Sequence, residues 1–488
     1  MPNSALFTDF YSLTMAQGYW KRNPKDCAVF EMIYRHQPFG GGYAVFAGLG
    51  SLLESLADFS FSQSDISYLK DLKMFDDGFL DYLKDFRFNG SLWAMDEGTT
   101  IFPHEPLLRV EGRLAECQII EGLILNTVNF QTLIATKTRR IWLAGGKGNI
   151  MEFGLRRAQG ENGALSASRA AFIGGASGTS NVLAAKTFNI PVMGTMAHSW
   201  IMSFDSEEDA FDAYAAIYPD KAVFLIDTYD TLKSGIKSAI KSGKKLAAAG
   251  KNFGVRLDSG DIQYLSCEVR RLLDEAGLNN AFITVSNDLD ENIIDTLYKA
   301  GVPVNIWGVG TRLITGGMDS AFTGVYKMAA RLERGTGSDK AGAAASVPVM
   351  KFSDNPEKTT SPGIKQVWRI RDRNNLAVAD VMGLDGKEEF VTGQRRIFWH
   401  PSADYRHFSH TIEGEAAPLL KKWIERGEPV KDPPALDAIR NFAAADIESF
   451  DATYKRLLNP HVYKVSVTEN LRSIKLDLIQ KHFGNKNG

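Results

Sequence analysis

Four stretches of the sequence decide the fold of this chain: VFLIDTYD (residues 223–230), FGVRLDSGD (253–261), AFITVSND (281–288) and VPVNIWGVGT (302–311). Each begins with a short apolar run, and these runs start 30, 28 and 21 residues apart. The intervening segments have helical character. Short apolar strands that alternate with helices are typical of βα units around a buried parallel sheet.

Two similar apolar runs come earlier in the chain, at Ile150–Phe153 and Ile190–Gly194. At least six βα units in succession favour a closed β/α barrel over an open sheet. The regions on either side have mixed helical and strand-like patterns. We expect the small, polar segment 331–346 to be an exposed loop and the tail 481–488 to be frayed.

The charge balance excludes proteins that bind polyanions through a large positive field. The chain has 488 residues with 56 Lys+Arg against 58 Asp+Glu, which gives a net charge of -2. Nucleic-acid binding of that kind needs an excess of positive charge. A small anionic ligand needs only a few local cations and therefore remains compatible with the composition.

The three cysteines, Cys27, Cys117 and Cys267, are far apart and odd in number. They argue against a disulfide framework and against a cysteine-rich zinc site. No basic segment followed by an apolar core opens the sequence, and apolar runs stay short of the roughly 18 residues of a membrane span. We therefore expect a cytoplasmic protein without a signal peptide or a membrane partner.

A polar segment follows each predicted strand. These segments are GLRRAQG (154–160), TMAHS (195–199), DTYD (227–230), DSGD (258–261), SND (286–288) and GVGT (308–311). In a β/α barrel, residues at the carboxyl ends of the strands face a common mouth, where active sites lie. Arginines, carboxylates, one histidine and several backbone NH groups are therefore expected to converge there.

This set of groups suits phosphoryl or phosphoribosyl chemistry. Arginine binds carboxylates and phosphates bidentately, and glycine-rich turns bring backbone NH groups close to a phosphate. Carboxylates beside phosphates are typical of Mg²⁺ sites. A lone histidine can act as a base or as a nucleophile.

Each motif taken alone also has a structural interpretation. Arg156 could form a weak surface ion pair, His198 could lie in the core, Asp258–Asp261 could cap a helix, and Gly174–Asn181 could be only a loop and a helix start. What favours a functional interpretation is their shared position after consecutive strands.

Several known motifs are absent from the sequence. It contains no G-x-x-x-x-G-K-[ST], G-x-G-x-x-G, G-x-S-x-G or H-E-x-x-H, which argues against a P-loop, dinucleotide redox chemistry, an α/β-hydrolase and a zincin. His407 and His410 lie outside the strand pattern, and we interpret them as structural.

The sequence resembles nicotinate phosphoribosyltransferases, of the type II phosphoribosyltransferase class, along nearly the whole chain. The most specific segments are MEFGLRRAQG (151–160), PVMGTMAHSW (191–200) and GVRLDSGD (254–261). Further similar segments are TDFYSLTMAQGYW (8–20), GGASGTSNVLAA (174–185), LIDTYDTLKSG (225–235) and WGVGT (307–311).

The resemblance implies an ATP-coupled enzyme, formally a ligase, that converts nicotinate and phosphoribosyl pyrophosphate to nicotinate mononucleotide and pyrophosphate. This reaction is the first step of NAD salvage from nicotinate. The implied fold is α/β: an irregular β/α barrel (residues 141–350) and a mixed α/β domain built from the N-terminal (1–140) and C-terminal (351–488) segments. It also implies a homodimer with active sites at the interface and no nucleic-acid partner.

The resemblance also assigns residues to nicotinate. Tyr11 of the neighbouring subunit and Phe153 would stack on the pyridine ring. Arg256 would bind the carboxylate, with Thr195 near the ring. Relatives that use nicotinamide carry Asp at the position of Ser180, where an Asp would repel the carboxylate of nicotinate.

The remaining assignments concern phosphates. Arg156, Asp227 and Asp258 would handle phosphoribosyl pyrophosphate, and the two carboxylates would hold Mg²⁺. Backbone groups of five residues would cradle the 5-phosphate: Ser286, Asn287, Gly308, Gly310 and Thr311. His198 resembles the histidine that ATP phosphorylates, and it is expected to be catalytic together with Arg256 and Asp258.

Two alternatives stay open. One is a nicotinamide phosphoribosyltransferase with the same fold. The other is a catalytically inactive barrel that only binds nucleotides or a partner protein, and the presence of Arg156, His198, Arg256 and Asp258 argues against it.

Overall fold

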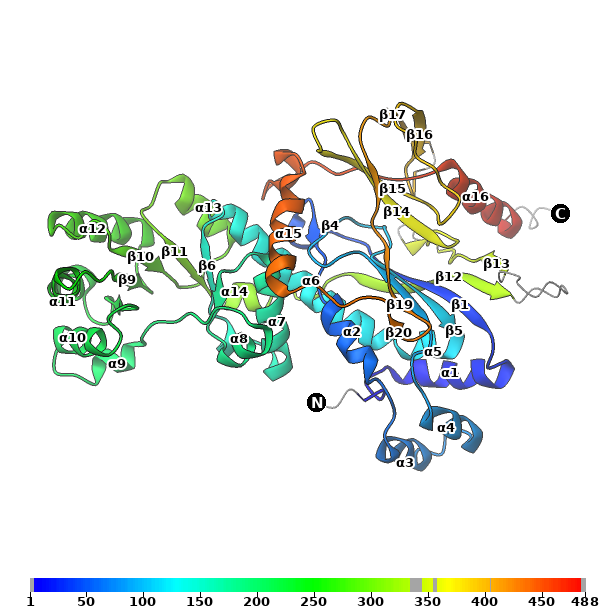
Figure 1. Cartoon of the computed structure of the whole chain (residues 1–488), viewed down its shortest axis with the longest axis horizontal. Coiled ribbons are helices and arrows are strands. Elements are labelled where there is room, and N and C mark those ends of the chain that lie inside the picture. The colour runs from blue at the N-terminus through cyan, green and yellow to red at the C-terminus, as the bar shows by residue number, and fades with distance from the viewer. Residues whose placement is uncertain (1–3, 334–344, 354–357, 404, 484–488) are drawn as a thin grey trace. The chain divides into compact units, whose positions relative to one another are not determined.

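The computed structural model describes residues 4–333, 345–353, 358–403 and 405–483 (Figure 1). The chain divides into two compact units: a central unit of residues 134–320, and a terminal unit of residues 1–133 and 321–488. Most of the predicted loop at 331–346 lies outside the described residues, as does the end of the tail from residue 484.

The central unit contains a six-stranded sheet in which all neighbouring strands are parallel, with the order β7-β6-β11-β10-β9-β8. Its strands are β6 (Asn149–Glu152), β7 (Gly178–Thr179), β8 (Val223–Leu225), β9 (Gly254–Leu257), β10 (Phe282–Val285) and β11 (Ile306–Val309). Most of their residues are buried, as expected for parallel strands covered by helices. The predicted α/β class is confirmed.

The sheet is a curled half-barrel rather than a closed barrel. Beyond β7 the only recorded neighbour in the described chain is a single parallel bridge between Thr179 and Val192. The run Ile190–Gly194, expected to be a full strand, contributes only this bridge. Among the described residues, no backbone pairing joins Val192 to β8.

Two other strand predictions differ from the structure. Strand β7 was not predicted, because Gly178 and Thr179 do not form an apolar run. The apolar pattern predicts the last strand at Val302–Ile306, whereas β11 begins at Ile306. Pro303 explains this shift, because proline has no NH group for a central strand ladder.

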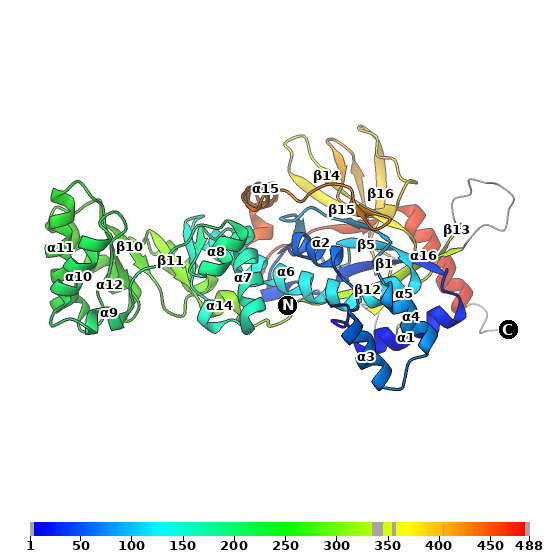
Figure 2. The same cartoon turned by 60° about the horizontal axis from the view of Figure 1, so that its bottom comes forward.

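Helices connect the strands of the central unit and lie beside the sheet (Figures 1 and 2). They are η2 (Leu155–Arg157), α7 (Gly160–Gly174), α8 (Val182–Phe188), α9 (His198–Met202), α10 (Glu207–Ile217), η3 (Thr231–Gly235), α11 (Ile236–Ala248), α12 (Ile262–Glu275), α13 (Glu291–Lys299) and α14 (Thr311–Ile314). Aspartates start three of them, and two of these belong to the polar segments that follow the strands. The carboxylates of Asp230, Asp261 and Asp290 accept backbone NH groups at the starts of η3, α12 and α13.

The terminal unit contains an antiparallel seven-stranded sheet, β13-β12-β1-β5-β3-β19-β20, and a mixed six-stranded sheet, β17-β16-β21-β15-β14-β18. The first comprises β1 (Cys27–Tyr34), β3 (Ser91–Ala94), β5 (Leu108–Arg113), β12 (Gly324–Glu333), β13 (Ala345–Pro348), β19 (Lys421–Glu425) and β20 (Glu428–Pro429). The second comprises β14 (Lys365–Arg371), β15 (Ala377–Leu384), β16 (Arg395–Trp399), β17 (His407–Thr411), β18 (Ala416–Pro418) and β21 (Val465–Val467). Strands β2 (Ala44–Val45) and β4 (Thr100–Ile101) form a separate pair.

The other helices are α1 (Phe10–Arg22), η1 (Pro38–Gly40), α2 (Leu49–Ala57), α3 (Gln63–Asp71), α4 (Asp77–Lys84), α5 (Leu114–Ile119), α6 (Glu121–Ala144), α15 (Leu436–Glu448), η5 (Ala452–Lys455) and α16 (Glu469–Phe483). Strands β12 and β13 belong to the terminal unit, because β12 pairs with β1 along its length. These two strands therefore lie outside the central unit, although the expected range 141–350 placed them in the barrel.

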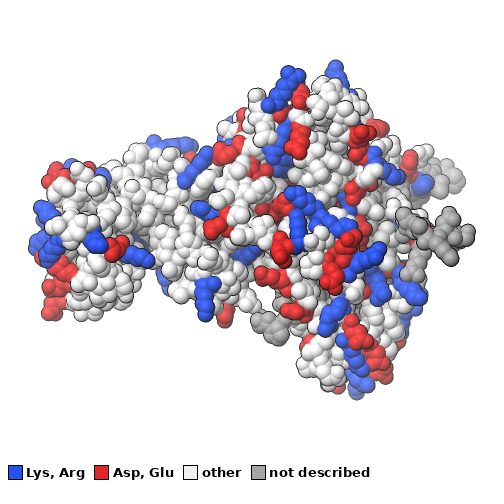
Figure 3. Space-filling view, in the orientation of Figure 1, with Lys and Arg blue, Asp and Glu red and all other residues white. Residues whose placement is uncertain are grey.

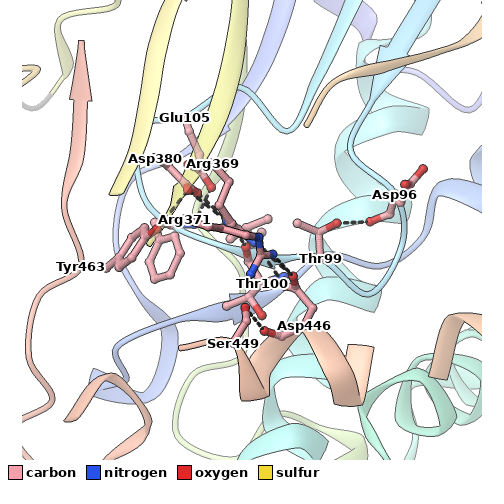
Figure 4. A network of polar contacts seen from close by, with 12 residues as sticks. Asp96, Thr99, Thr100, Glu105, Arg369, Arg371, Asp380, Asp446, Ser449 and Tyr463 are labelled. Carbon is pink, nitrogen blue, oxygen red and sulfur yellow. Dashed lines mark hydrogen bonds and ion pairs between the residues drawn. The ribbon is translucent and has the colours of Figure 1, made fainter. Parts of the chain in front are cut away.

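A buried arginine joins the N-terminal and C-terminal parts of the terminal unit (Figure 4). Arg369 of β14 is 1% exposed and forms a bidentate pair with Asp380 of β15, at 3.0 and 2.7 Å. It also contacts Asp446 of α15 at 3.2 Å and donates to the carbonyl of Thr100 at 2.6 Å. The network explains how segments more than 250 residues apart in sequence form one unit.

On the face shown in Figure 3, basic and acidic side chains are interspersed, and the described residues there show no large area of one sign. Such a surface agrees with the near-zero net charge.

Candidate active site

Arg256, on β9, is the centre of the candidate site. Its guanidinium donates three side-chain hydrogen bonds: Nε to the Ser286 hydroxyl (2.9 Å), Nη1 to the Thr195 hydroxyl (2.9 Å) and Nη2 to the Asp258 carboxylate (2.8 Å). A guanidinium has five N–H groups, so one on each terminal nitrogen remains for a ligand. The three hydrogen bonds fix the orientation of the guanidinium, so the two remaining N–H groups are fixed in position as well. The side chain is 14% exposed.

Asp258 follows β9 and shares the network of Arg256. Its Oδ1 also accepts a short hydrogen bond from the Ser286 hydroxyl. Burial by itself would raise the pKa of Asp258, but the hydrogen bond from Ser286 and the positive charge of Arg256 lower it below its ordinary value. The carboxylate is therefore held in its ionised form.

Asp227, directly after β8, is joined to Asp258 through the backbone. Its Oδ2 accepts from the NH of Asp258 at 3.0 Å and from the Ser259 hydroxyl at 2.5 Å. Its Oδ1 is buried and has no hydrogen-bond partner in the described part of the chain. A buried carboxylate oxygen without a donor is costly, so this position suits an added ligand such as a hard cation.

His198 begins α9 and lies beside the same carboxylate. Its Nδ1 is 3.1 Å from the hydroxyl oxygen of Thr228, and its Nε2 is 3.8 Å from Oδ2 of Asp258. The imidazole is 41% exposed. It is therefore both oriented by the protein and accessible to a ligand.

Phe153 supplies an aromatic face next to the guanidinium. Its backbone NH donates to Val309 at 2.8 Å, and its ring centre is 5.4 Å from the guanidinium carbon of Arg256. A Cβ at Gly308 would come within 3.0 Å of two ring atoms. Glycine at this position therefore leaves the room that the ring occupies.

The turn after β10 can present backbone NH groups to an anion. Asn287 and Asp288 have φ values of 98° and 27°, and Ser286 precedes them within the Arg256 network. Within the described residues, the NH groups of Asn287 and Asp288 have no recorded acceptor. Successive NH groups in such turns form anion-binding concavities. Gly310 and Thr311 lie at the carboxyl end of the next strand, β11.

One residue that supports the site is not predicted by the motifs of the sequence. Glu152 is fully buried and accepts hydrogen bonds from the Gly154 NH, the Ser168 hydroxyl (2.9 Å) and the Thr179 hydroxyl (2.5 Å). Its carbonyl accepts from the Ser180 NH at 2.9 Å. A lone carboxylate in an apolar strand was the available signal, since such a group must be hydrogen-bonded when buried.

The structure does not bring every expected residue into this network. Arg156 lies in η2, is exposed, and has no recorded ion pair among the described residues. Ser180 follows β7 and contacts Glu152 rather than Arg256. Tyr11 lies on α1 of the terminal unit and is 48% exposed.

These features define a class of protein. Parallel strands present an arginine, ionised carboxylates, an accessible histidine and unoccupied NH groups at their carboxyl ends, as in α/β enzymes that act on anionic substrates.

Comparison with known proteins identifies the family. The family model described as "Nicotinate phosphoribosyltransferase (NAPRTase) family" matches residues 149–396, and the models of its N-terminal and C-terminal domains match residues 6–129 and 364–475. The chain belongs to the nicotinate phosphoribosyltransferase family, which is a family of enzymes.

Individual relatives agree with this assignment. The nicotinate phosphoribosyltransferase of Bacillus subtilis is 41% identical over 98% of this chain and 95% of its own length. That of Caenorhabditis elegans is 35% identical over 96% of this chain and 92% of its own. The crystal structure of human nicotinic acid phosphoribosyltransferase superposes with a TM-score of 0.83 at 28% identity, covering 96% of this chain and 99% of that one.

One helical stretch, Leu114–Ala144, is long and apolar enough to cross a membrane by length and composition alone. Of its most apolar window, 67% is buried inside the protein, as in a core helix. In the described part of the chain, no group of three or more His, Cys, Asp or Glu side chains could hold a metal ion.

Proposed function

We propose that this chain transfers the phosphoribosyl group of phosphoribosyl pyrophosphate to nicotinate, with coupled hydrolysis of ATP. The observation that carries the proposal is the fork of Arg256, which keeps two N–H groups for a ligand and lies beside the ring of Phe153. Nicotinate offers the matching pair of features, a carboxylate on a flat aromatic ring. Nicotinamide has no negative charge for the guanidinium.

The pyridine ring would stack on Phe153, and the exposed Tyr11 of a second copy would cover its other face. Ser180 would leave the surroundings of the carboxylate without a negative charge. The protein would then act as a homodimer in the cytoplasm with active sites at the subunit interface.

Phosphates would occupy the polar turns around this ring. Unlike Arg256, Arg156 has no recorded partner among the described residues, and it would bind the pyrophosphate. The NH groups at Asn287 and Asp288, with Ser286 and the segment from Gly308 to Thr311, would receive the 5-phosphate.

Asp227 and Asp258 are the residues that would hold Mg²⁺. The two carboxylates fit this ion. Asp227 Oδ1 has no donor in the described chain, and the lowered pKa of Asp258 keeps its carboxylate ionised. Mg²⁺ is commonly held by one or two carboxylates plus substrate phosphates. When bound, Mg²⁺ would neutralise charge on the leaving pyrophosphate.

In the reaction, the bond from ribose C1 to pyrophosphate breaks and a bond from C1 to the pyridine nitrogen forms. That nitrogen carries no proton, so the chain does not need a general base. Instead, Phe153 and Arg256 would align the pyridine ring against C1, and Arg156 would stabilise the negative charge of the leaving pyrophosphate.

His198 is the proposed acceptor of phosphate from ATP. The bond between the γ-phosphorus and the β–γ bridging oxygen breaks, a phosphorus–nitrogen bond forms, and ADP leaves. The neighbouring Thr228 fixes the ring, and Asp258 faces Nε2. Incubation with γ-labelled ATP should give an acid-labile, base-stable label, and its persistence in His198→Gln would disprove this role.

A base-selectivity assay tests the function itself. Purified protein is given phosphoribosyl pyrophosphate with nicotinate or nicotinamide, with and without ATP, and pyrophosphate release is measured. We expect faster turnover of nicotinate and stimulation by ATP. Faster turnover of nicotinamide would support the alternative base, and ligand binding without pyrophosphate release would indicate an inactive barrel.

The shared site has its own test. Tyr11→Ala and Arg256→Gln chains, each nearly inactive alone, should regain part of the activity when mixed and allowed to exchange subunits, because one site in the mixed dimer would have both residues intact. No recovery in confirmed mixed dimers would contradict the interface proposal.

A further inference from the structure

The terminal unit contains a pocket of about 540 Å³ that none of the roles proposed above uses. Three side chains in its lining are basic: Arg35 after β1, Arg406 before β17, and Lys464 before β21. None of the three forms an ion pair with a described carboxylate. In the described chain, the lining of this cationic pocket contains no Asp or Glu.

Histidine side chains also border this pocket. His104, His400, His407 and His461 all line the pocket, although the whole chain has only eight histidines. Four of the eight histidines therefore border one pocket, and they come from three separate segments of the chain. The interpretation of His407 as purely structural is incomplete, because its side chain borders a cavity.

Neighbouring groups hold several of these side chains in place. Nδ1 of His400 accepts the backbone NH groups of Ser402 (3.2 Å) and Ala403 (3.0 Å). The Lys464 ammonium lies 5.1 Å from the ring centre of Phe408.

One carboxylate, Asp451, interacts electrostatically with His461, but its Oδ1 is already hydrogen-bonded to the NH (2.9 Å) and hydroxyl (2.6 Å) of Thr453. Below the pocket, the lining residue Tyr463 donates to the buried Asp380 at 3.1 Å, within the network of Figure 4. The pocket therefore has a rigid floor, and its cationic rim includes no carboxylate among the described lining residues.

We infer that this cationic pocket binds a phosphorylated small organic molecule. Arginine, lysine and imidazole N–H groups are the donors that bind phosphate oxygens. A volume of about 540 Å³ is larger than an inorganic phosphate needs and falls in the range of pockets for small organic ligands. The partly buried ring of Phe408 offers an apolar face for the rest of the molecule.

The inference does not depend on the reaction proposed for the central unit, and every residue that carries it belongs to the terminal unit. It adds a second anion site to the chain.

Equilibrium dialysis tests the number of sites, with labelled ATP, labelled glucose 6-phosphate and labelled inorganic phosphate as probes. The pocket variant is Arg406→Gln/Lys464→Gln. The control, Lys237→Gln/Lys244→Gln on α11, removes the same charge from exposed positions elsewhere. All four side chains are exposed, and circular dichroism confirms folding.

For at least one organic phosphate, we expect the pocket variant to bind one equivalent per chain at least tenfold more weakly, while the control binds as the unaltered chain does. Turnover of nicotinate in the absence of the pocket ligand should be the same in all three proteins. Equal binding by the pocket variant and the unaltered chain would overturn the inference. Binding of inorganic phosphate alone would also overturn the assignment to an organic molecule.

Photolabelling with azido-ATP gives an independent readout. Label in peptides 400–403, 405–408 or 461–466 would support the pocket. Label restricted to residues 152–311 would overturn the inference for nucleotides and leave the proposed reaction untouched. The glucose 6-phosphate arm then decides whether a smaller organic phosphate occupies the pocket or nothing does.

Discussion

Replacing Arg256 by glutamine should turn a selective enzyme into an unselective one. The guanidinium is held by Ser286, Thr195 and Asp258, and its two remaining N–H groups are the ones proposed to bind the nicotinate carboxylate. Glutamine keeps a polar side chain but loses the charge and the fork. Nicotinate should therefore lose far more from the substitution than nicotinamide.

The magnitude follows from the number of contacts. Hydrogen bonds to charged groups contribute about 1.5–3 kcal/mol each, so two of them contribute roughly 3–6 kcal/mol. At about 1.4 kcal/mol per factor of ten, kcat/KM for nicotinate should fall by about 10²–10⁴. Nicotinamide can lose only ordinary hydrogen bonds of about 0.5–1.5 kcal/mol, so its kcat/KM should fall by roughly tenfold or less.

The assay measures kcat/KM for both bases at saturating phosphoribosyl pyrophosphate and ATP. Arg157→Gln is the matched control, because Arg157 is an exposed arginine of η2 without a recorded ion pair among the described residues. Arg256→Lys should give an intermediate loss, because it restores the charge without the fork. Equal losses for the two bases in Arg256→Gln would refute the assignment of this guanidinium to the carboxylate.

Four further changes have defined outcomes. Ser180→Asp should lower kcat/KM for nicotinate at least roughly tenfold through charge repulsion, while Ser180→Asn should not; an unchanged nicotinate rate in Ser180→Asp would contradict the selectivity argument. Asp227→Asn should raise the Mg²⁺ concentration for half-maximal activity about tenfold or more, and an unchanged titration would exclude it as a ligand. Arg369→Met should lower the free energy of unfolding by about 3–5 kcal/mol, because it leaves buried carboxylates uncompensated, whereas the exposed Arg373→Met should not change it measurably. The pKa of Glu291 is lowered, since two basic side chains outweigh the effect of burial, so Glu291→Gln should be less stable than the unaltered chain at neutral pH. This difference in the free energy of unfolding should shrink as pH falls through the folded-state pKa of the carboxyl, and denaturant unfolding at several pH values measures it.

Local patterns in the sequence predicted much of the central unit. The apolar runs at Ile150, Val223, Phe253 and Ala281 coincide with strands β6, β8, β9 and β10. A buried parallel strand is apolar on both faces, so it is visible as a short continuous run. Strand β7 is only two residues long and carries no such pattern, and for that reason it was not predicted.

The sequence also indicated which polar residues could form a site, because the carboxyl ends of parallel strands meet at one edge. It did not indicate which of them would touch. Arg256 contacts Ser286 and Thr195 because β9 lies beside β10 and the segment before α9 reaches the same edge. Strand order of this kind is a property of packing and cannot be read from the spacing of apolar residues.

By itself, then, the sequence determined the α/β class, the family resemblance and the candidate residue types. Only the tertiary structure decided that the half-barrel stays open beyond Val192, that Glu152 supports the site from below, and that Arg369 joins the two ends of the chain. It also assembled the cationic pocket from separate segments. The physical reason is the same in each case. These features depend on contacts between residues far apart in sequence, and such contacts form only when the strands and helices pack together.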